Sequence, residues 1–441
     1  MQLREALSLP TGLRYVTDLL PLQSGVARRM LMEMDWLHDA EQITVRYRQL
    51  ETYIAAITPV EHDLDRRNLQ FRLQGLKDIY HTIERLQGKQ VLDDIELFEV
   101  KHLALIYEEI QHLMNRLQLS LPEADLQPVV QILDPEGMHI ASFYIYDAYS
   151  PELHTLRQQL ERKPQDEQLF NRVQDEEQRI RTALSEQLHP YAGRLNEVFH
   201  CLVDTDILLA KAVLAKEWRL CLPEVSRNGE TVLQKMWNPE VAHALEQRHR
   251  SYQPVSIALG NHPTILTGSN MGGKTIVLKT VGLCQLLFQY AFPIPAESAR
   301  IPVRDAVCCS MTDNQSATEG LSSFAAEMQQ LNRILHSARE GVNLLALIDE
   351  PARTTNPTEG TALVSALIGC IAPTQCCTLM VTHYTVDAQH CPCLRVRGLE
   401  EGRMNYELIE AREGEVPHEA VNIAAALGID PQWLAQTKRY L

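Results

Sequence analysis

The sequence feature that most constrains this chain is a glycine-rich segment at residues 267–275, which reads TGSNMGGKT. It fits the phosphate-binding pattern G-x-x-x-x-G-K-[ST]. The four fixed positions of the pattern are filled by Gly268, Gly273, Lys274 and Thr275. An apolar run at 264–266 predicts the strand that enters the segment, and the apolar run that starts at Ile276 predicts the helix that leaves it. A strand, a phosphate loop and a helix in this order indicate a nucleotide site.

Each part of the loop has an expected role in holding ATP and Mg²⁺. Backbone N–H groups and the positive end of the helix bind phosphate oxygens. We expect Lys274 to reach the outer phosphates and the Thr275 hydroxyl to ligate Mg²⁺. The residues expected to bind the nucleotide are Gly268, Ser269, Asn270, Met271, Gly272, Gly273, Lys274, Thr275 and Ile276.

Two carboxylates and an imidazole follow later strands. An apolar strand at 344–348 ends in Asp349 and Glu350. Side chains at the carboxyl end of a parallel strand face the ligand crevice. We therefore expect Asp349 to hold Mg²⁺ and Glu350 to polarise the attacking water. His383, after the next strand, would contact the γ-phosphate or orient the water. The alternatives are ordinary surface acids and a structural histidine.

A serine-capped helix is expected between the loop and the acidic strand. Ser322 is a good N-cap for a helix whose apolar residues recur at helical spacing. A capped helix N-terminus attracts anions. In ATPases that hold a nucleotide between two subunits, such a helix completes the site of the partner, so Ser322 is expected to act in trans. The alternative is an amphipathic helix with no such role.

Periodicity divides the chain into helical and alternating regions. Apolar residues at three- and four-residue spacing predict packed helices before residue 230, whereas short apolar strands alternate with helices beyond it. The fold class expected is multidomain: an all-α lever region, an α/β P-loop (ABC-like) ATPase domain and a C-terminal helix-turn-helix. The expected segments are a helical core at 1–120, a short insertion at 121–150, a helical lever at 151–230, the ATPase domain at 231–415 and a helical dimerisation element at 416–441.

The insertion and the helix that follows it carry local signals. Residues 134–137 predict a turn, and the alternation at 139–146 predicts a short strand. Ser150 as N-cap, with Pro151 at the first helical position, predicts the start of the next helix.

Composition limits the partners and the compartment. The formal net charge of −16 argues against general affinity for nucleic acid, because phosphate contacts need a basic surface. No stretch approaches the length of a membrane span, and the N-terminus lacks the profile of a signal peptide, so we expect a cytoplasmic protein. Among the ten cysteines the one tight cluster is at 390–393. A metal there is the alternative to buried thiols in a reducing compartment.

The C-terminal half resembles the ATPase domain of the MutS family. The residues that carry the resemblance are Asn270 and Met271 in the loop, Ser322, Ser323, Phe324, Glu327 and Met328 in the helix, Asp349, Glu350, Thr355 and Gly360 around the acidic strand, Thr382, His383 and Tyr384 after the next strand, and 424–431 near the end. The resemblance implies that Tyr252 stacks on adenine and that residues 416–441 help to form a homo- or heterodimer. It covers residues 235–441 well and residues 13–230 more loosely.

Several departures from the family bear on which client, DNA or another protein, the chain acts on. Mismatch readers wedge a Phe of an F-x-E motif into the duplex, and no Phe of this chain is followed by x-Glu. Residues 121–150 are short for a DNA clamp, and no nuclease-like extension is expected. After the acidic strand, Ala352 and Thr354 replace the two family glycines. The run at 349–360 resembles MutS-like proteins associated with cobalamin-dependent aminomutases.

Three functions therefore remain open. The first is a DNA-acting MutS homologue, related to mismatch repair, whose ATP-driven dimer closure makes its levers hold duplex DNA. The second is an ATP-dependent reactivating chaperone for a cobalamin-dependent aminomutase, with no DNA client. The third is an assembly protein that binds ATP without hydrolysing it, which Glu350 and His383 argue against.

Overall fold

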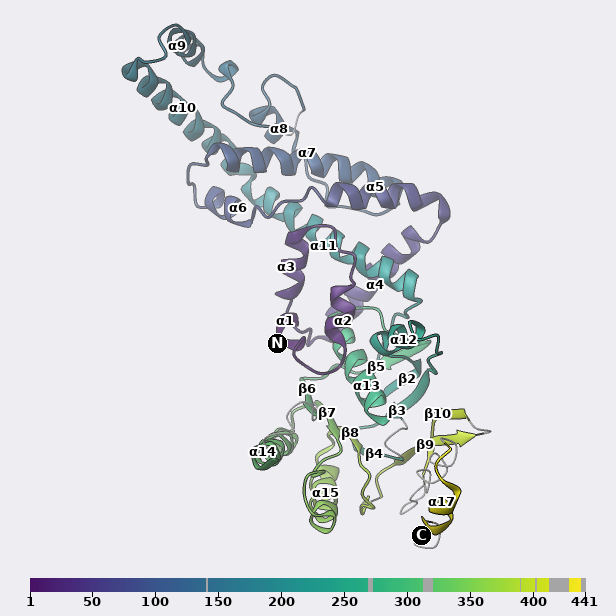
Figure 1. Cartoon of the computed structure of the whole chain (residues 1–441). Coiled ribbons are helices and arrows are strands. Elements are labelled where there is room, and N and C mark those ends of the chain that lie inside the picture. The colour runs from purple at the N-terminus through teal and green to yellow at the C-terminus, as the bar shows by residue number, and fades with distance from the viewer. Residues whose placement is uncertain are drawn as a thin grey trace. The chain divides into compact units, whose positions relative to one another are not determined.

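The computed structural model describes residues 1–139, 142–268, 273–311, 320–388, 390–400, 403–411 and 428–437, without the side chains of 320–323, 399, 403 and 431. The chain forms two compact units (Figure 1). The first, which we call the α/β unit, contains Met1–Leu20, Glu33–Arg48 and Leu214–Leu441, and the second, the helical unit, contains Pro21–Met32 and Gln49–Val213. Among the described residues, no helix is long and apolar enough to cross a membrane.

The helical unit is built from helices that pack on one another, as the periodicity predicts. Its elements are α3 (Gly25–Met32), η1 (Val60–His62), α5 (Asp63–Leu73), α6 (Tyr80–Gln87), α7 (Asp94–Arg116), α8 (Gln127–Leu133), η2 (Asp147–Tyr149), α9 (Pro151–Arg162), α10 (Glu167–Leu188) and η3 (His189–Tyr191). The residues of α4 (Ala40–Ile57) and α11 (Ala192–Trp218) are divided between the two units. The predicted cap of α9 is confirmed, because the Ser150 hydroxyl accepts from Leu153 N at 3.3 Å and Pro151 is the first helical residue.

The insertion at 121–150 contains a turn but no strand in its described part. The turn is confirmed by Gly137 N, which donates to Asp134 O at 3.0 Å. The strand predicted at 139–146 is wrong for its described residues, and 140–141 lie outside them. The segment is held instead by the buried Lys101, whose Nζ donates to Asp134 Oδ1 at 3.1 Å, Ser142 O at 3.2 Å and the Tyr146 hydroxyl at 3.3 Å. These bonds satisfy polar groups of the insertion without a partner strand.

Lys101 and Asp134 form an ion pair with almost no solvent exposure. Burial alone would raise the pKa of Asp134, but the bonds from His139 N and Lys101 lower it below its usual value. We expect Lys101→Ala to lower the free energy of unfolding by about 3 kcal/mol, because it leaves a buried carboxylate without its cation. Urea denaturation followed by far-UV circular dichroism measures the loss. The control is Lys101→Met combined with Asp134→Leu, which should lose less. A loss below about 1 kcal/mol in Lys101→Ala would contradict the structural role of the pair.

The α/β unit contains two sheets. The six-stranded sheet has the order β10-β9-β4-β8-β7-β6, in which β9 and β10 pair antiparallel and the other neighbours pair parallel. The four-stranded sheet has the order β1-β5-β2-β3. The strands are β1 (Glu224–Val225), β2 (Thr231–Met236), β3 (Val255–Leu259), β4 (Pro263–Thr267), β5 (Ser298–Ile301), β6 (Ala306–Ser310), β7 (Leu344–Asp349), β8 (Cys377–Val381), β9 (Cys393–Glu400) and β10 (Arg403–Glu410). The described helices of the unit, besides the shared α4 and α11, are α1 (Leu3–Ala6), α2 (Leu13–Asp18), α12 (Pro239–Glu246), α13 (Lys274–Gln289), α14 (Gly320–Arg339), α15 (Pro357–Ile371), η4 (Ala372–Thr374) and α17 (Pro431–Thr437).

The expected α/β class is confirmed, and the second sheet is an addition to it. The strands expected at 264–266 and 344–348 appear as β4 and β7, and the strand expected before His383 appears as β8. The separate sheet of β1, β5, β2 and β3 was not expected. The helix-turn-helix expected within 416–441 stays a prediction, because 416–427 and 438–441 lie outside the described residues and α17 is the one helix in the described part.

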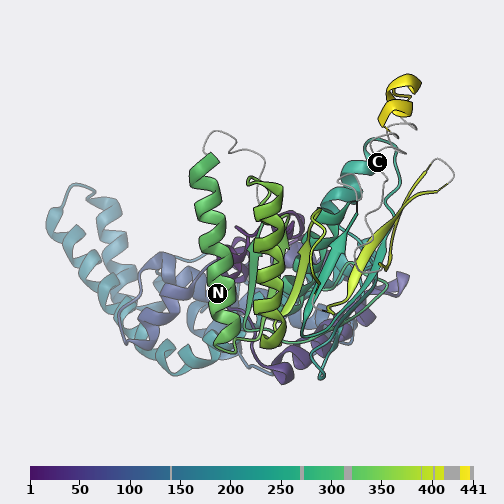
Figure 2. The ribbon, with the colours of Figure 1, turned by 90° about the horizontal axis from the view of Figure 1, so that it is seen from below.

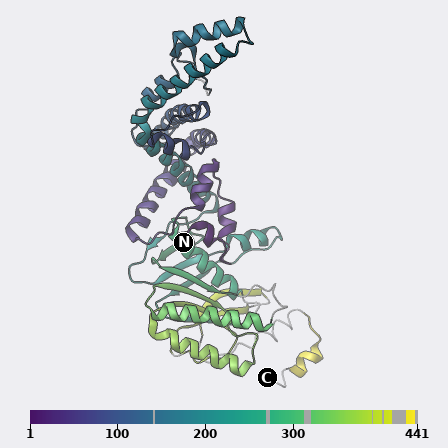
Figure 3. The ribbon, with the colours of Figure 1, turned by 90° about the vertical axis from the view of Figure 1, so that its left-hand side faces the viewer.

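The alternation of β7 places helices on both faces of the larger sheet. Leu344, Ala346 and Ile348 belong to a buried cluster with residues of α14 and α15. Leu347 points the other way and meets α13, where a Cβ on Gly282 would lie 2.6 Å from its Cδ1. Figures 2 and 3 show α14 and α15 side by side along the sheet. With both faces covered, ligands can reach only the carboxyl edge of the parallel strands.

Candidate nucleotide-binding site

The two ends of the phosphate loop are shaped by glycines. Gly268 follows β4 with φ 125°, and Gly273 precedes α13 with φ 70°. Residues with a Cβ rarely adopt either conformation. At Gly273 a Cβ would also lie 3.3 Å from the ring of Tyr406. Both glycines are therefore required by the backbone. The other expected loop residues, Ser269, Asn270, Met271 and Gly272, lie outside the described residues.

Lys274 lies inside the loop that it closes. It is the first residue of α13 and is 4% exposed. Its Nζ donates to Gly268 O at 2.7 Å, so the ammonium reaches from the last turn of the loop back to its first residue. A buried cation at a helix N-terminus is suited to bind phosphate.

Thr275 and Asp349 meet across the carboxyl edge of the sheet. The Thr275 hydroxyl donates to Asp349 Oδ2 at 2.9 Å. Asp349 Oδ1 is buried and has no hydrogen-bond partner among the described residues. Burial raises the pKa of Asp349 and so does Glu350, whereas Thr275, Lys274 and Lys279 act against the rise. A hydroxyl beside a carboxylate with an unsatisfied oxygen fits Mg²⁺, which prefers oxygen ligands and usually keeps several waters.

Glu350 is held in an uncommon backbone conformation. Its φ is 44°, and its N–H donates to Val381 O at 2.9 Å. The carboxylate is 13% exposed, and its Oε2 lies 3.2 Å from Arg353 Nη1. Strained residues with over-determined contacts are common at active sites. The sequence reasoning missed Arg353, although its three-residue spacing from Glu350 allows such a pair.

His383 lies at the same edge of the sheet as Glu350. Val381, the last residue of β8, pairs with Asp349, and His383 follows two residues later. The imidazole is exposed, and its ring centroid lies 4.3 Å from that of Tyr384. The part of the imidazole in hydrolysis stays a prediction.

Ser322 and Tyr252 are placed less directly. Ser322 lies in the first turn of α14, and its side chain is outside the described residues. Tyr252 is half-buried, and burial raises the pKa of its hydroxyl despite hydrogen bonds with Asn238 and Thr280. Its neighbour Gln253 bonds to β10, where Tyr406 N donates to Gln253 Oε1 at 3.0 Å. Adenine stacking on Tyr252 stays a prediction.

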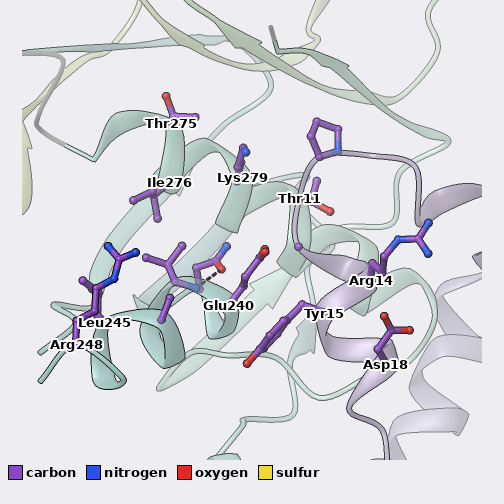
Figure 4. Close-up of a pocket in the computed structure, with 15 residues that line it drawn as sticks. Thr11, Arg14, Tyr15, Asp18, Glu240, Leu245, Arg248, Thr275, Ile276 and Lys279 are labelled. Carbon is purple, nitrogen blue, oxygen red and sulfur yellow. Dashed lines mark hydrogen bonds between the residues drawn. The ribbon is translucent and has the colours of Figure 1, made fainter. Parts of the chain in front are cut away.

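A cavity of about 730 Å³ adjoins the start of α13. Figure 4 shows Thr275, Ile276 and Lys279 on one side of it, and residues of α2 and α12 on the others. Three of its lining residues are basic (Arg14, Arg248 and Lys279) and two are acidic (Asp18 and Glu240). Tyr252 does not line it. The start of α13 thus borders a space of mixed charge.

The metal alternative at 390–393 gains no support. Among the described residues, no group of three or more His, Cys, Asp or Glu side chains could hold a metal ion. None of the described cysteines forms a disulfide, and burial raises the pKa of Cys391, as expected for an unreactive thiol.

A strand, a glycine loop closed by a buried lysine, and a Thr–Asp pair at the edge of a parallel sheet define a P-loop nucleotide-binding domain. Residues 264–395 match the family model MutS domain V. This part of the chain is therefore similar to the ATPase domain of the MutS family.

The relatives found among characterised proteins agree with this assignment. The chain is 31% identical over 278 residues to the "Endonuclease MutS2" of Pediococcus pentosaceus, covering 60% of this chain and 34% of that protein. It is 32% identical over 221 residues to the protein of the same name from Agathobacter rectalis, covering 49% of this chain and 27% of that protein. It is 30% identical over 280 residues to the protein of the same name from Caldanaerobacter subterraneus subsp. tengcongensis, and this match covers 61% of this chain and 34% of that protein. The chain thus spans about a third of the length of these relatives.

Proposed function

We propose that the chain is a cytoplasmic ATP-binding and ATP-hydrolysing switch that works as a homo- or heterodimer. The observation that carries the proposal is the Thr275–Asp349 hydrogen bond beside the buried Lys274, with Asp349 Oδ1 left unsatisfied. It brings a phosphate-binding cation and a Mg²⁺-binding pair to one edge of the sheet.

The residues divide the work of hydrolysis. Lys274 and the loop amides hold the phosphates, and Thr275 and Asp349 hold Mg²⁺, which when bound neutralises charge on the outer phosphates. Glu350 orients and polarises the attacking water. Arg353 balances the charge of Glu350 before the reaction. His383 contacts the γ-phosphate or the water, and Tyr252 stacks on the base.

Dimer formation completes the site. Ser322, at the N-terminus of α14, acts on the nucleotide of the partner subunit, and residues 416–441 help to hold the dimer. Nucleotide state then sets dimer geometry, and the helical unit carries the change to the client.

Duplex DNA is the first client that we propose. The support is the match of residues 264–395 to MutS domain V, together with the name of the relatives, which are called endonucleases. The alternative is an ATP-dependent reactivating chaperone for a cobalamin-dependent aminomutase. Its support is the net charge of −16, which disfavours phosphate contacts, and the unusual run at 349–360.

If duplex DNA is the client, we expect it to change the rate of ATP hydrolysis at ~0.15 M salt, where non-specific contacts are weak. The measurement is steady-state ATPase activity across a wide range of DNA concentrations. Lys274→Ala serves as the control for contaminating ATPase. A rate that never responds would favour the protein client, and an aminomutase recovered with the tagged chain from its native cell would support it.

A further inference from the structure

The loop after β7 holds two non-glycine residues in the left-handed region. Glu350 has φ 44° and Ala352 has φ 60°. For a residue with a Cβ this conformation costs about 1–2 kcal/mol. Such residues persist only when the surrounding structure fixes them. The loop that carries Glu350 must therefore be held by specific contacts.

Both the N–H and the carbonyl group of Ala352 form hydrogen bonds with side chains of other elements. Ala352 N donates to Oε1 of Glu327, on α14, at 3.3 Å. Ala352 O accepts from the hydroxyl of Tyr384, after β8, at 2.8 Å. Ala352 is 1% exposed and Tyr384 is 8% exposed. Because little water reaches these bonds, their loss is not compensated by solvent.

A glycine makes room for this arrangement. A Cβ on Gly360, in the first turn of α15, would lie 2.5 Å from the Tyr384 hydroxyl oxygen. The hydroxyl therefore reaches Ala352 only because residue 360 has no side chain. Burial raises the pKa of the Tyr384 hydroxyl, and the negative charges of Glu327 and Glu350 raise it further. The hydroxyl therefore keeps its proton and remains a hydrogen-bond donor.

We propose that Glu327 and Tyr384 are positioning residues for Glu350. They fix the Ala352 peptide groups, and this sets the direction in which Glu350, two residues earlier, presents its carboxylate. The inference rests on the proposed ATP hydrolysis. It also makes α14 and the segment after β8 parts of one support, so that a displacement of either moves the acid.

The test compares two replacements of Glu327. Glu327→Gln keeps an oxygen that can accept from Ala352 N, and should retain kcat within about twofold. Glu327→Ala removes the acceptor and should lower kcat about tenfold, because one buried hydrogen bond contributes about 1–1.5 kcal/mol. The KM for ATP should change little in either variant, since each substitution acts on the loop after β7. Steady-state ATPase assays give both constants.

Tyr384→Phe provides an independent variant, and is expected to lower kcat to a similar extent. When combined with Glu327→Ala it should lower kcat by less than the product of the single effects, because both act on the same peptide groups. The matched control is Glu340→Ala, an exposed glutamate just beyond the other end of α14. Binding of a fluorescent ATP analogue confirms that each variant is folded.

Three results would contradict the positioning role of Glu327 and Tyr384. An equal loss in Glu327→Gln and Glu327→Ala would show that Glu327 acts through its charge, which overturns the inference. Unchanged kcat in Glu327→Ala and Tyr384→Phe overturns it too, while leaving the proposed hydrolysis intact. A wild-type chain that binds ATP but never hydrolyses it would overturn the proposed hydrolysis, and the positioning role with it.

Discussion

Glu350→Gln is expected to lower the rate of ATP hydrolysis about a thousandfold while ATP still binds. The amide has nearly the shape of the carboxylate, but it can neither take a proton from the attacking water nor polarise it. General base catalysis contributes about 10²- to 10⁴-fold. The experiment measures kcat at saturating Mg²⁺–ATP, and the dissociation constant of a fluorescent ATP analogue in the same variant.

The control for this variant is Glu359→Gln, which changes a nearby exposed acid in the first turn of α15. It should keep the wild-type rate. Full turnover in Glu350→Gln would mean that another group activates the water, and the assignment of Glu350 would have to be abandoned.

Lys274→Ala is expected to remove ATP binding and hydrolysis together. The variant loses the buried ammonium inside the loop and its bond to Gly268 O. Loss of a preorganised charge that faces a phosphoryl group costs about 10²- to 10³-fold. We therefore expect kcat/KM to fall about a thousandfold, and the analogue to bind too weakly for titration.

Lys235→Ala is the matched control, because its ammonium is exposed and pairs with Glu297 on the surface. Its kcat/KM should equal that of the wild type. If Lys274→Ala bound ATP with unchanged affinity, the phosphates would have to lie elsewhere, and the whole site would need to be reassigned.

Local pattern was sufficient to predict the strands that carry the site. Continuous apolar runs such as 344–348 are buried on both faces, so their strand character and the acids that follow them could be predicted from the sequence. β2 and β5 were missed because they belong to a sheet with exposed positions, where the apolar pattern is weak. The segment at 139–146 alternates like a strand, yet in its described part the contacts of Lys101 replace pairing with another strand.

The contacts that hold the loop of Glu350 could not be predicted from the spacing of residues in the sequence. Residues Glu327, Ala352 and Tyr384 are far apart in the sequence, and they meet only because α14 and β8 both adjoin β7. In the run at 349–360, Ala352 and Thr354 replace two family glycines, and residues with a Cβ have fewer allowed backbone conformations than glycine. In the structure Ala352 nevertheless adopts a left-handed conformation, held by these distant partners.

The Thr275–Asp349 hydrogen bond has a consequence for the order in which ligands enter. The hydroxyl oxygen and the carboxylate that would bind Mg²⁺ already satisfy part of each other's bonding, so a free ion must compete with an existing contact. A dehydrating Mg²⁺ gains little from one hydroxyl and one carboxylate without phosphate oxygens. Metal loading should therefore accompany the nucleotide, and the metal alone should leave the site in its resting arrangement.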